Sequence, residues 1–159
     1  MVLALAVTCA ALAADVQISA SARLKGDLDS QALFELLNLP GEKLGTDALV
    51  KVFHTSDHLV GIDCRQTARP SASYDCEVRI TSRSQGLNVG LGNGILVKDG
   101  EIIAMILNAN DASALFDILK TDTGTESAKH FATADERLKI SCTTTMCNVS
   151  ISSGSAKLN

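Results

Sequence analysis

Three side chains capable of acid-base or metal chemistry fall within five residues of one another: His54, Asp57 and His58. Imidazole nitrogens and a carboxylate at this spacing can bind a metal ion, and an imidazole can act as a general base. The same residue types also occur in solvated turns, where they do no chemistry. The segment is therefore a candidate site whose role depends on what the rest of the chain says about it.

A second segment of the chain bears on this interpretation, because KHFATAD at 129–135 matches KVFHTSD at 51–57. The matching segment keeps neither histidine, and only the aspartate is common to both, as Asp57 and Asp135. An aspartate shared by two tight turns normally accepts a hydrogen bond from its own backbone. We therefore expect structural or solvated histidines and no bound metal.

Four cysteines follow the two matching segments in pairs, Cys64 with Cys76 and then Cys142 with Cys147. Eleven residues separate the first pair and four separate the second, unlike the two-residue spacing of structural zinc sites. Each segment should link its own pair, so we predict disulfides Cys64–Cys76 and Cys142–Cys147, formed in an oxidising compartment. The fifth cysteine, Cys9, lies in the N-terminal segment.

The first disulfide loop is the longer of the two and is rich in arginine. With the strand that follows, it contains Arg65, Arg69, Tyr74, Arg79 and Arg83, and Tyr74 is the single tyrosine of the chain. Arginine and tyrosine contribute disproportionately to protein-protein binding, and a disulfide at the base of a loop lowers the entropy lost on binding. We predict that these five residues contact an acidic surface of a partner protein. The alternative is a solvated hairpin tip.

The first thirteen residues are apolar without interruption. They are too few to cross a bilayer of about 30 Å at about 1.5 Å per helical residue. The run ends in Ala-Leu-Ala at 11–13, the small-x-small pattern of a signal peptidase site, although no lysine or arginine precedes it. We predict a signal peptide over 1–13, export to the periplasm or the medium, and no stable membrane insertion after cleavage.

The elements that must position these residues occur twice. Residues 29–37 (DSQALFELL) return as 111–119 (DASALFDIL), and both predict a short helix with one apolar stripe, capped by Asp29 or Asp111. An alternating strand precedes each helix, and β-rich segments follow it. The cysteines are in phase with the apolar residues of their strands, which predicts disulfides between neighbouring strands on the core side.

The predicted fold is α+β, with two tandem β-α-β-β-β repeats, each with one helix packed on an antiparallel sheet and a disulfide-stapled hairpin. Repeat unit 1 spans 14–83 and repeat unit 2 spans 100–159. The glycine-rich linker at 84–99 does not fit a phosphate-binding loop, because its glycines precede a strand at 95–97 rather than a helix. We therefore expect no cofactor, and an edge strand where the two units meet.

The net charge of −4 is spread evenly along the chain. Residues 15–85 carry ten acids and eight bases, and residues 86–159 carry eight acids and six bases. Nucleic-acid binding depends on neutralising phosphates with lysine and arginine. Because neither half is basic, we expect no nucleic-acid partner.

The repeated helix-on-sheet arrangement resembles the topology of small exported inhibitors, the cystatins and the tandem-repeat β-lactamase inhibitory protein. Cystatins carry Gln-x-Val-x-Gly in a hairpin, and the nearest stretch here, HLVG at 58–61, lacks the glutamine. The resemblance implies a fold and transfers no residue role.

Together these patterns favour an exported, non-enzymatic binding or inhibitor-like module that acts by protein-protein contact. One alternative is a small envelope hydrolase that uses carboxylates or His54 and His58, although the chain has no Gly-x-Ser-x-Gly nucleophile motif. Another is a structural envelope protein without a specific ligand.

Overall fold

The computed structural model describes most of the chain between Ile18 and Ser152. The described residues are 18–25, 28–68, 72–82, 93–120 and 128–152. The predicted signal peptide at 1–13 lies outside them, as do Arg69, Arg83 and the glycine-rich part of the linker. Within the described residues, no helix has the length and apolar character needed to span a bilayer.

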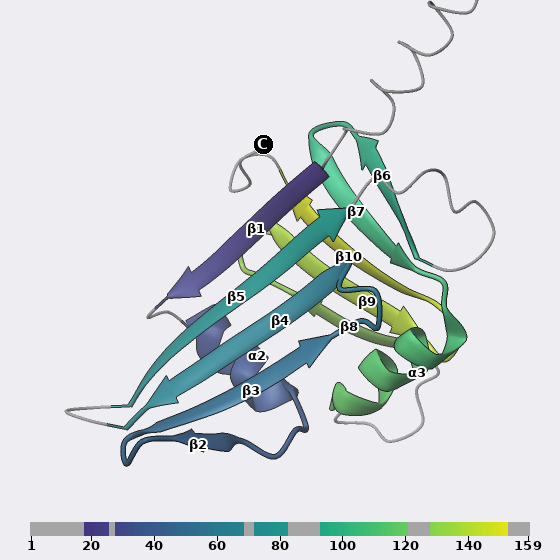
Figure 1. The fold of residues 1–159 in the computed structure, drawn as a ribbon. Coiled ribbons are helices and arrows are strands. Elements are labelled where there is room, and N and C mark those ends of the chain that lie inside the picture. The colour runs from purple at the N-terminus through teal and green to yellow at the C-terminus, as the bar shows by residue number, and fades with distance from the viewer. Residues whose placement is uncertain (1–17, 26–27, 69–71, 83–92, 121–127, 153–159) are drawn as a thin grey trace, which may run out of the picture.

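The described strands form two five-stranded antiparallel sheets, shown in Figure 1. The first sheet has the order β1-β5-β4-β3-β2, and the second has the order β6-β7-β10-β9-β8. The first contains β1 (Ile18–Lys25), β2 (Glu42–Leu44), β3 (Ala48–His54), β4 (Val60–Thr67) and β5 (Ser73–Ser82), with helix α2 (Leu28–Leu36) between β1 and β2. The second contains β6 (Gly94–Lys98), β7 (Glu101–Ile106), β8 (Ala128–Ala132), β9 (Leu138–Thr143) and β10 (Cys147–Ser152), with helix α3 (Ala109–Ile118) between β7 and β8.

The two sheets have the same strand order over four of their strands. The set β1-β5-β4-β3 corresponds to β7-β10-β9-β8, and a helix follows the first strand of each set. The fifth strands lie on opposite edges, with β2 beside β3 and β6 beside β7. The α+β class is therefore confirmed. Beyond the four strands predicted for each unit, β6 is the edge strand predicted in the linker, whereas β2 was not predicted. Sequence alternation missed β2 because its three residues are all exposed.

Strand β6 contains the strand predicted at 95–97. The turn that joins it to β7 has positive φ at Asp99 (52°) and Gly100 (78°). Two consecutive positive φ values are typical of the tight turn that matches the twist of an antiparallel hairpin. The end of the predicted linker is therefore an edge strand of the second sheet.

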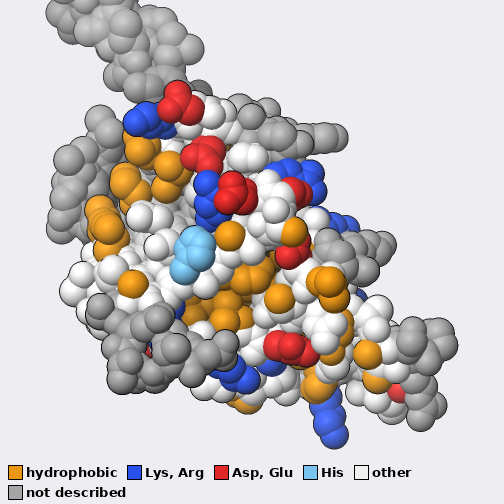
Figure 2. Space-filling view, turned by 180° about the vertical axis from the view of Figure 1, so that it is seen from behind, with side chains coloured by type: hydrophobic (Ala, Val, Ile, Leu, Met, Phe, Trp, Pro, Cys, Tyr) orange, Lys and Arg blue, Asp and Glu red, His pale blue; other side chains and the backbone are white. Residues whose placement is uncertain are grey.

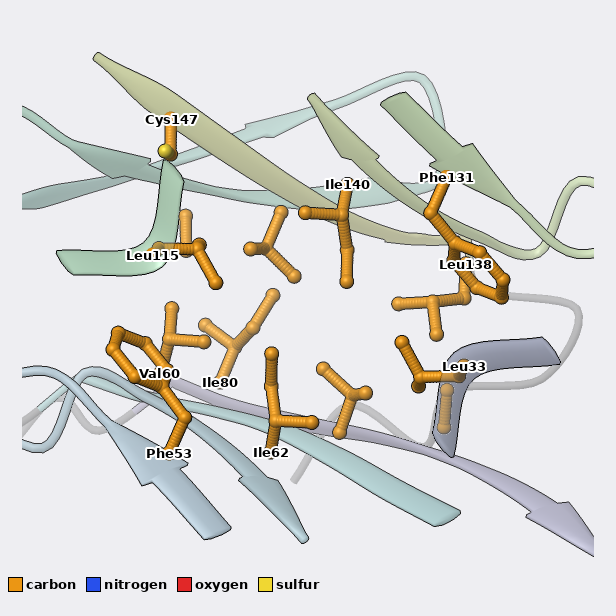
Figure 3. Close-up of a cluster of buried hydrophobic side chains, with 14 of the residues drawn as sticks. Leu33, Phe53, Val60, Ile62, Ile80, Leu115, Phe131, Leu138, Ile140 and Cys147 are labelled. Carbon is orange, nitrogen blue, oxygen red and sulfur yellow. The ribbon is translucent and has the colours of Figure 1, made fainter. Parts of the chain in front are cut away.

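The apolar faces of the two sheets pack against each other and form one hydrophobic core. Figure 3 shows side chains of the first sheet, Phe53, Val60, Ile62 and Ile80, facing Phe131, Leu138 and Ile140 of the second. Leu33 of α2 and Leu115 of α3 are fully buried at opposite ends of this layer. We expected each helix to cover its own sheet. Each does pack on its own sheet, but helices of nine and ten residues are too short to cover five strands, and the opposite sheet covers the rest.

Both predicted disulfides are present. Cys64 lies directly opposite Cys76 on β4 and β5, and Cys142 lies opposite Cys147 on β9 and β10, with Cα atoms 4.1 Å apart in each pair. All four cysteines are fully buried in the core. The pairing follows from the alternation of the strands, which puts both cysteines of a pair on the inner face of neighbouring strands.

The prediction that Asp29 and Asp111 cap the helices is wrong. The cap of α3 is Asn108, whose Oδ1 accepts hydrogen bonds from the backbone N–H groups of Asn110 and Asp111 at 3.0 and 3.2 Å. Helix α2 already begins at Leu28. Both aspartates therefore lie inside the first helical turn, where their carboxylates are free to bond elsewhere.

Each of these aspartates instead holds a hairpin turn in the other half of the chain. Asp111 accepts hydrogen bonds from the backbone N–H and the hydroxyl of Ser56, both at 2.9 Å. Asp29 accepts from the backbone N–H of Ala134 at 3.1 and 3.2 Å. The two contacts are reciprocal: the start of α3 bonds the turn between β3 and β4, and the start of α2 bonds the turn between β8 and β9. They fix the relative orientation of the two sheets.

We expect Asp111→Ala to destabilise the protein more than Asp29→Ala. Asp111 is 7% exposed, and its loss leaves two partly buried donors of Ser56 without an acceptor, which costs about 1–3 kcal/mol. Asp29 makes the matching bond where water can replace the carboxylate, so we expect a loss below about 1 kcal/mol. Urea unfolding under oxidising conditions measures both, and equal losses would contradict this account of the contact.

Candidate functional site

The outer face of the first sheet carries the described arginines of the predicted binding site. The register of β4 and β5 pairs Arg65 with Asp75, Asp63 with Glu77, and Gly61 with Arg79. Successive side chains of a strand point to opposite faces, so these residues lie on one face, opposite the buried cysteines. Arg65 and Arg79 are four register positions apart, which corresponds to about 13 Å along the strands. The structure thus brings them onto one surface without direct contact.

The charges on this face are only partly neutralised by one another. Arg23 on β1 donates two hydrogen bonds to Asp75, at 2.9 and 3.3 Å. Arg79 lies 3.7 Å from Glu77 through its Nε atom. Within the described part of the chain, Arg65 forms no ion pair. Arg65 and the outer nitrogens of Arg79 can therefore bind an external anion.

Tyr74 lies on the opposite face of the sheet from these arginines. Its ring packs against Phe34 of α2 with ring centroids 5.4 Å apart, and its hydroxyl accepts a hydrogen bond from Gln66 at 3.1 Å. Its side chain is only half-buried, but its contacts brace the β4–β5 hairpin against the helix. Tyr74 is close to the arginines in the sequence. Because successive side chains of a strand point to opposite faces, it lies on the other face of the sheet.

A hollow of about 450 Å³ opens on the same outer face, and we call it the Gly61 hollow. Its polar lining consists of His54, Asp57, His58, Arg79 and Thr81, and its apolar lining includes Val52 and the strand around Gly61. His54 ends β3, the turn after it contributes Asp57 and His58, and β5 contributes Arg79 and Thr81. Two segments that are separate in the sequence, 52–58 and 79–81, therefore converge on Gly61.

The two histidines form one wall of the Gly61 hollow. Their rings stack with centroids 4.7 Å apart and an interplanar angle of 27°. Nδ1 of His54 lies 3.2 Å from the carbonyl oxygen of Thr55, to which it can donate. His58 has φ of 60°, and Glu136 in the matching turn has φ of 59°, so the turn rather than the imidazole sets this conformation. Among the described residues, no three histidine, cysteine or acidic side chains are grouped to hold a metal ion.

Asp57 builds the turn, as its pairing with Asp135 in the sequence predicts. Its Oδ1 accepts from the hydroxyl of Thr55 at 2.7 Å and from the backbone N–H of Leu59 at 3.0 Å, and its Oδ2 accepts from Asn93 at 3.2 Å. Partial burial raises the pKa of Asp57, but these hydrogen bonds together outweigh it and hold the pKa below its ordinary value. Asp57 is therefore a carboxylate at neutral pH with both oxygens engaged.

The matching position on the second sheet is filled. There Lys139 stands where the first sheet has Gly61, between Ala132 on β8 and Ser150 on β10. Its Nζ lies 3.5 Å from a carboxylate oxygen of Glu101, which also accepts from the hydroxyl of Ser150 at 3.3 Å. Figure 2 shows the outer face of the second sheet, with apolar side chains gathered over β6 and β7. The two sheets share a core plan and differ in what they present outward.

The sequence pattern does not predict the Gly61 hollow, although four of the candidate residues, His54, Asp57, His58 and Arg79, line it. The one available signal was an isolated glycine inside a strand pattern, which often marks a close approach of another molecule. Nothing in the local pattern shows that Arg79 and His54 flank that glycine, because this depends on the strand register. Comparisons with protein-family models, curated proteins and solved structures found no match for this chain.

The hydrogen bonds of Asp57 predict an acid-dependent loss of stability. Its folded-state pKa lies below the ordinary value of 3.8, so its contribution is fully present above about pH 3.8 and is lost as the pH falls through the lower folded value. Asp57→Asn should therefore have a lower melting temperature than the parent protein at pH 7. The difference between the two melting temperatures should become smaller as the pH falls from 4 toward 2. Melting curves across that range would contradict this if the gap were constant.

Proposed function

We propose that this protein is an exported, non-enzymatic binding protein, inhibitor-like in its mode of action, that recognises an acidic surface of a partner protein through the outer face of the first sheet. The observation that carries the proposal is the contrast between the two outer faces. On the first sheet, Arg65 forms no ion pair among the described residues, and Arg79, which contacts Glu77 through Nε, lines an open hollow, whereas Lys139 on the second sheet is paired with Glu101.

The rigidity of the presenting strands supports this proposal. The disulfide between Cys64 and Cys76 lies on the inner face of β4 and β5, beneath the strands that carry Arg65 and Arg79. Strands joined in this way cannot separate, so little conformational entropy is lost when their outer side chains bind. Guanidinium groups pair with carboxylates through parallel hydrogen bonds, which favours an acidic partner. Arg69 and Arg83, outside the described residues, remain predicted contributors.

Export and duplication complete the proposal. Two buried disulfides are compatible with an exported protein, because such bonds persist in oxidising compartments. The apolar segment at 1–13 supports cleavage by a signal peptidase.

We also propose that the two sheets arose as tandem repeats, since their strand orders correspond and the segments 29–37 and 111–119 match in sequence.

Affinity capture with charge-reversed variants tests the binding function. We expect the Arg65→Glu, Arg79→Glu double variant to capture at least tenfold less partner from the exported fraction of the source cells, because like charges would face an acidic surface. Lys98→Glu, a matched reversal at an exposed position of β6, should capture normally. Equal capture by both variants at unchanged melting temperature would refute the proposal, and capture of nothing by any form would favour a structural envelope protein.

A small envelope hydrolase is the second candidate, because His54 and Asp57 line the same hollow. Against it, Asp57 is engaged by three hydrogen bonds, and the single hydroxyl side chain in the lining belongs to Thr81. We expect the purified protein to show no turnover of fluorogenic ester, peptide and glycoside substrates that depends on the two histidines. Turnover that disappears in a His54→Ala, His58→Ala variant would establish the hydrolase instead.

A further inference from the structure

Gly61 occupies a position where the fold itself does not need a glycine. It lies in β4, the central strand of its sheet, and the backbone there has no positive φ that would favour glycine. A Cβ atom added to it would meet only Nη2 of Arg79, at 4.0 Å, an ordinary van der Waals contact without a clash. A glycine inside a strand also weakens the strand, because it loses more conformational entropy than other residues and packs no side chain.

The groups around Gly61 converge on the space that its missing side chain leaves open. Nη2 of Arg79 lies directly above it, reaching over from β5. His54 is its register partner on β3, and the ring of His58 stacks on that of His54. Arg79 and the two histidines therefore lie on two sides of the glycine, and Val52, which is 52% exposed, supplies an apolar wall beside them.

We infer that the Gly61 hollow is a specificity pocket that receives one acidic side chain, aspartate or glutamate, of the partner protein. This inference rests on the proposed function. The planar guanidinium of Arg79 can bind a carboxylate through two parallel hydrogen bonds, and the N–H group of the His58 imidazole can add a further donor. The methylene groups of the entering side chain pack against Val52. Glycine at position 61 lets the carboxylate approach the strand closely enough to reach Arg79.

The second sheet shows what the same position looks like when it is closed. Lys139 occupies the place of Gly61 and bonds an internal carboxylate, that of Glu101. On the first sheet, Arg79 contacts Glu77 through its Nε atom at 3.7 Å, while its Nη2 lies over Gly61 beside the open hollow. The difference between the two sheets is therefore the side chain at the central position, because lysine covers the second sheet there and glycine leaves the first sheet open beside Nη2 of Arg79.

The decisive variant is Gly61→Val, which places a side chain over the strand beside Nη2 of Arg79 and changes no charged residue. Valine favours strands, so the melting temperature should be equal to or higher than that of the parent. The variant should bind the captured partner at least tenfold more weakly, because the carboxylate can no longer reach Arg79. Gly94→Val, a matched change in β6 where a Cβ would lie 3.8 Å from Met105, should leave binding unchanged.

A peptide titration followed by NMR identifies the entering group. Acetyl-Val-Glu-Val-amide should shift the Gly61 amide and His58 ring signals of the full protein, whereas the glutamine peptide and sodium acetate should shift them far less. Gly61→Val should abolish the shifts. Equal responses to the glutamate and glutamine peptides, equal responses to acetate alone, or normal partner binding by Gly61→Val would overturn the inference. If Gly61→Val binds normally while the Arg65→Glu, Arg79→Glu variant does not, the pocket is refuted and the binding function stands.

Discussion

Burial of two apolar sheet faces against each other is the constraint on which the rest of this molecule depends. Each helix is too short to cover five strands, so either sheet alone would expose apolar side chains to water. Because strand side chains alternate between two faces, the shared core also decides what lies outside it. Buried cysteines and isoleucines on one face of β4 and β5 leave their arginines and acids on the other.

Polar contacts at the edges of the core set how the sheets meet. Asp29 and Asp111 each bond a turn in the other half of the chain, and backbone hydrogen bonds join the helix ends through an antiparallel bridge between Leu37 and Leu119. The β3–β4 turn and the β8–β9 turn are not held in the same way. Asn93 donates to both Asp57 and Asp111, at 3.2 and 3.0 Å, and so ties the first turn to α3 on one side. At the matching turn, Asp135 bonds Arg137 instead.

The inner and outer faces of the two sheets follow different physical demands. Inner residues must fit a common core, and both sheets meet that demand with aliphatic side chains and one disulfide each. Outer residues face water and can differ without loss of packing. Lys139 therefore closes one face through an ion pair, while Gly61 leaves the other open beside Arg79. A binding role can develop on one sheet while the other contributes mainly to the core.

The sequence by itself determined the helices, most of the strands, both disulfides and the turn role of Asp57, because these depend on local periodicity and on matching segments of the chain. It could not reveal that the sheets share one core, or that Asp111 bonds Ser56 rather than capping α3. It also could not place Gly61 between His54 and Arg79 or turn Tyr74 away from the arginines. Only the tertiary structure decided these features, since strand register and contacts between distant segments leave no signature in a local pattern.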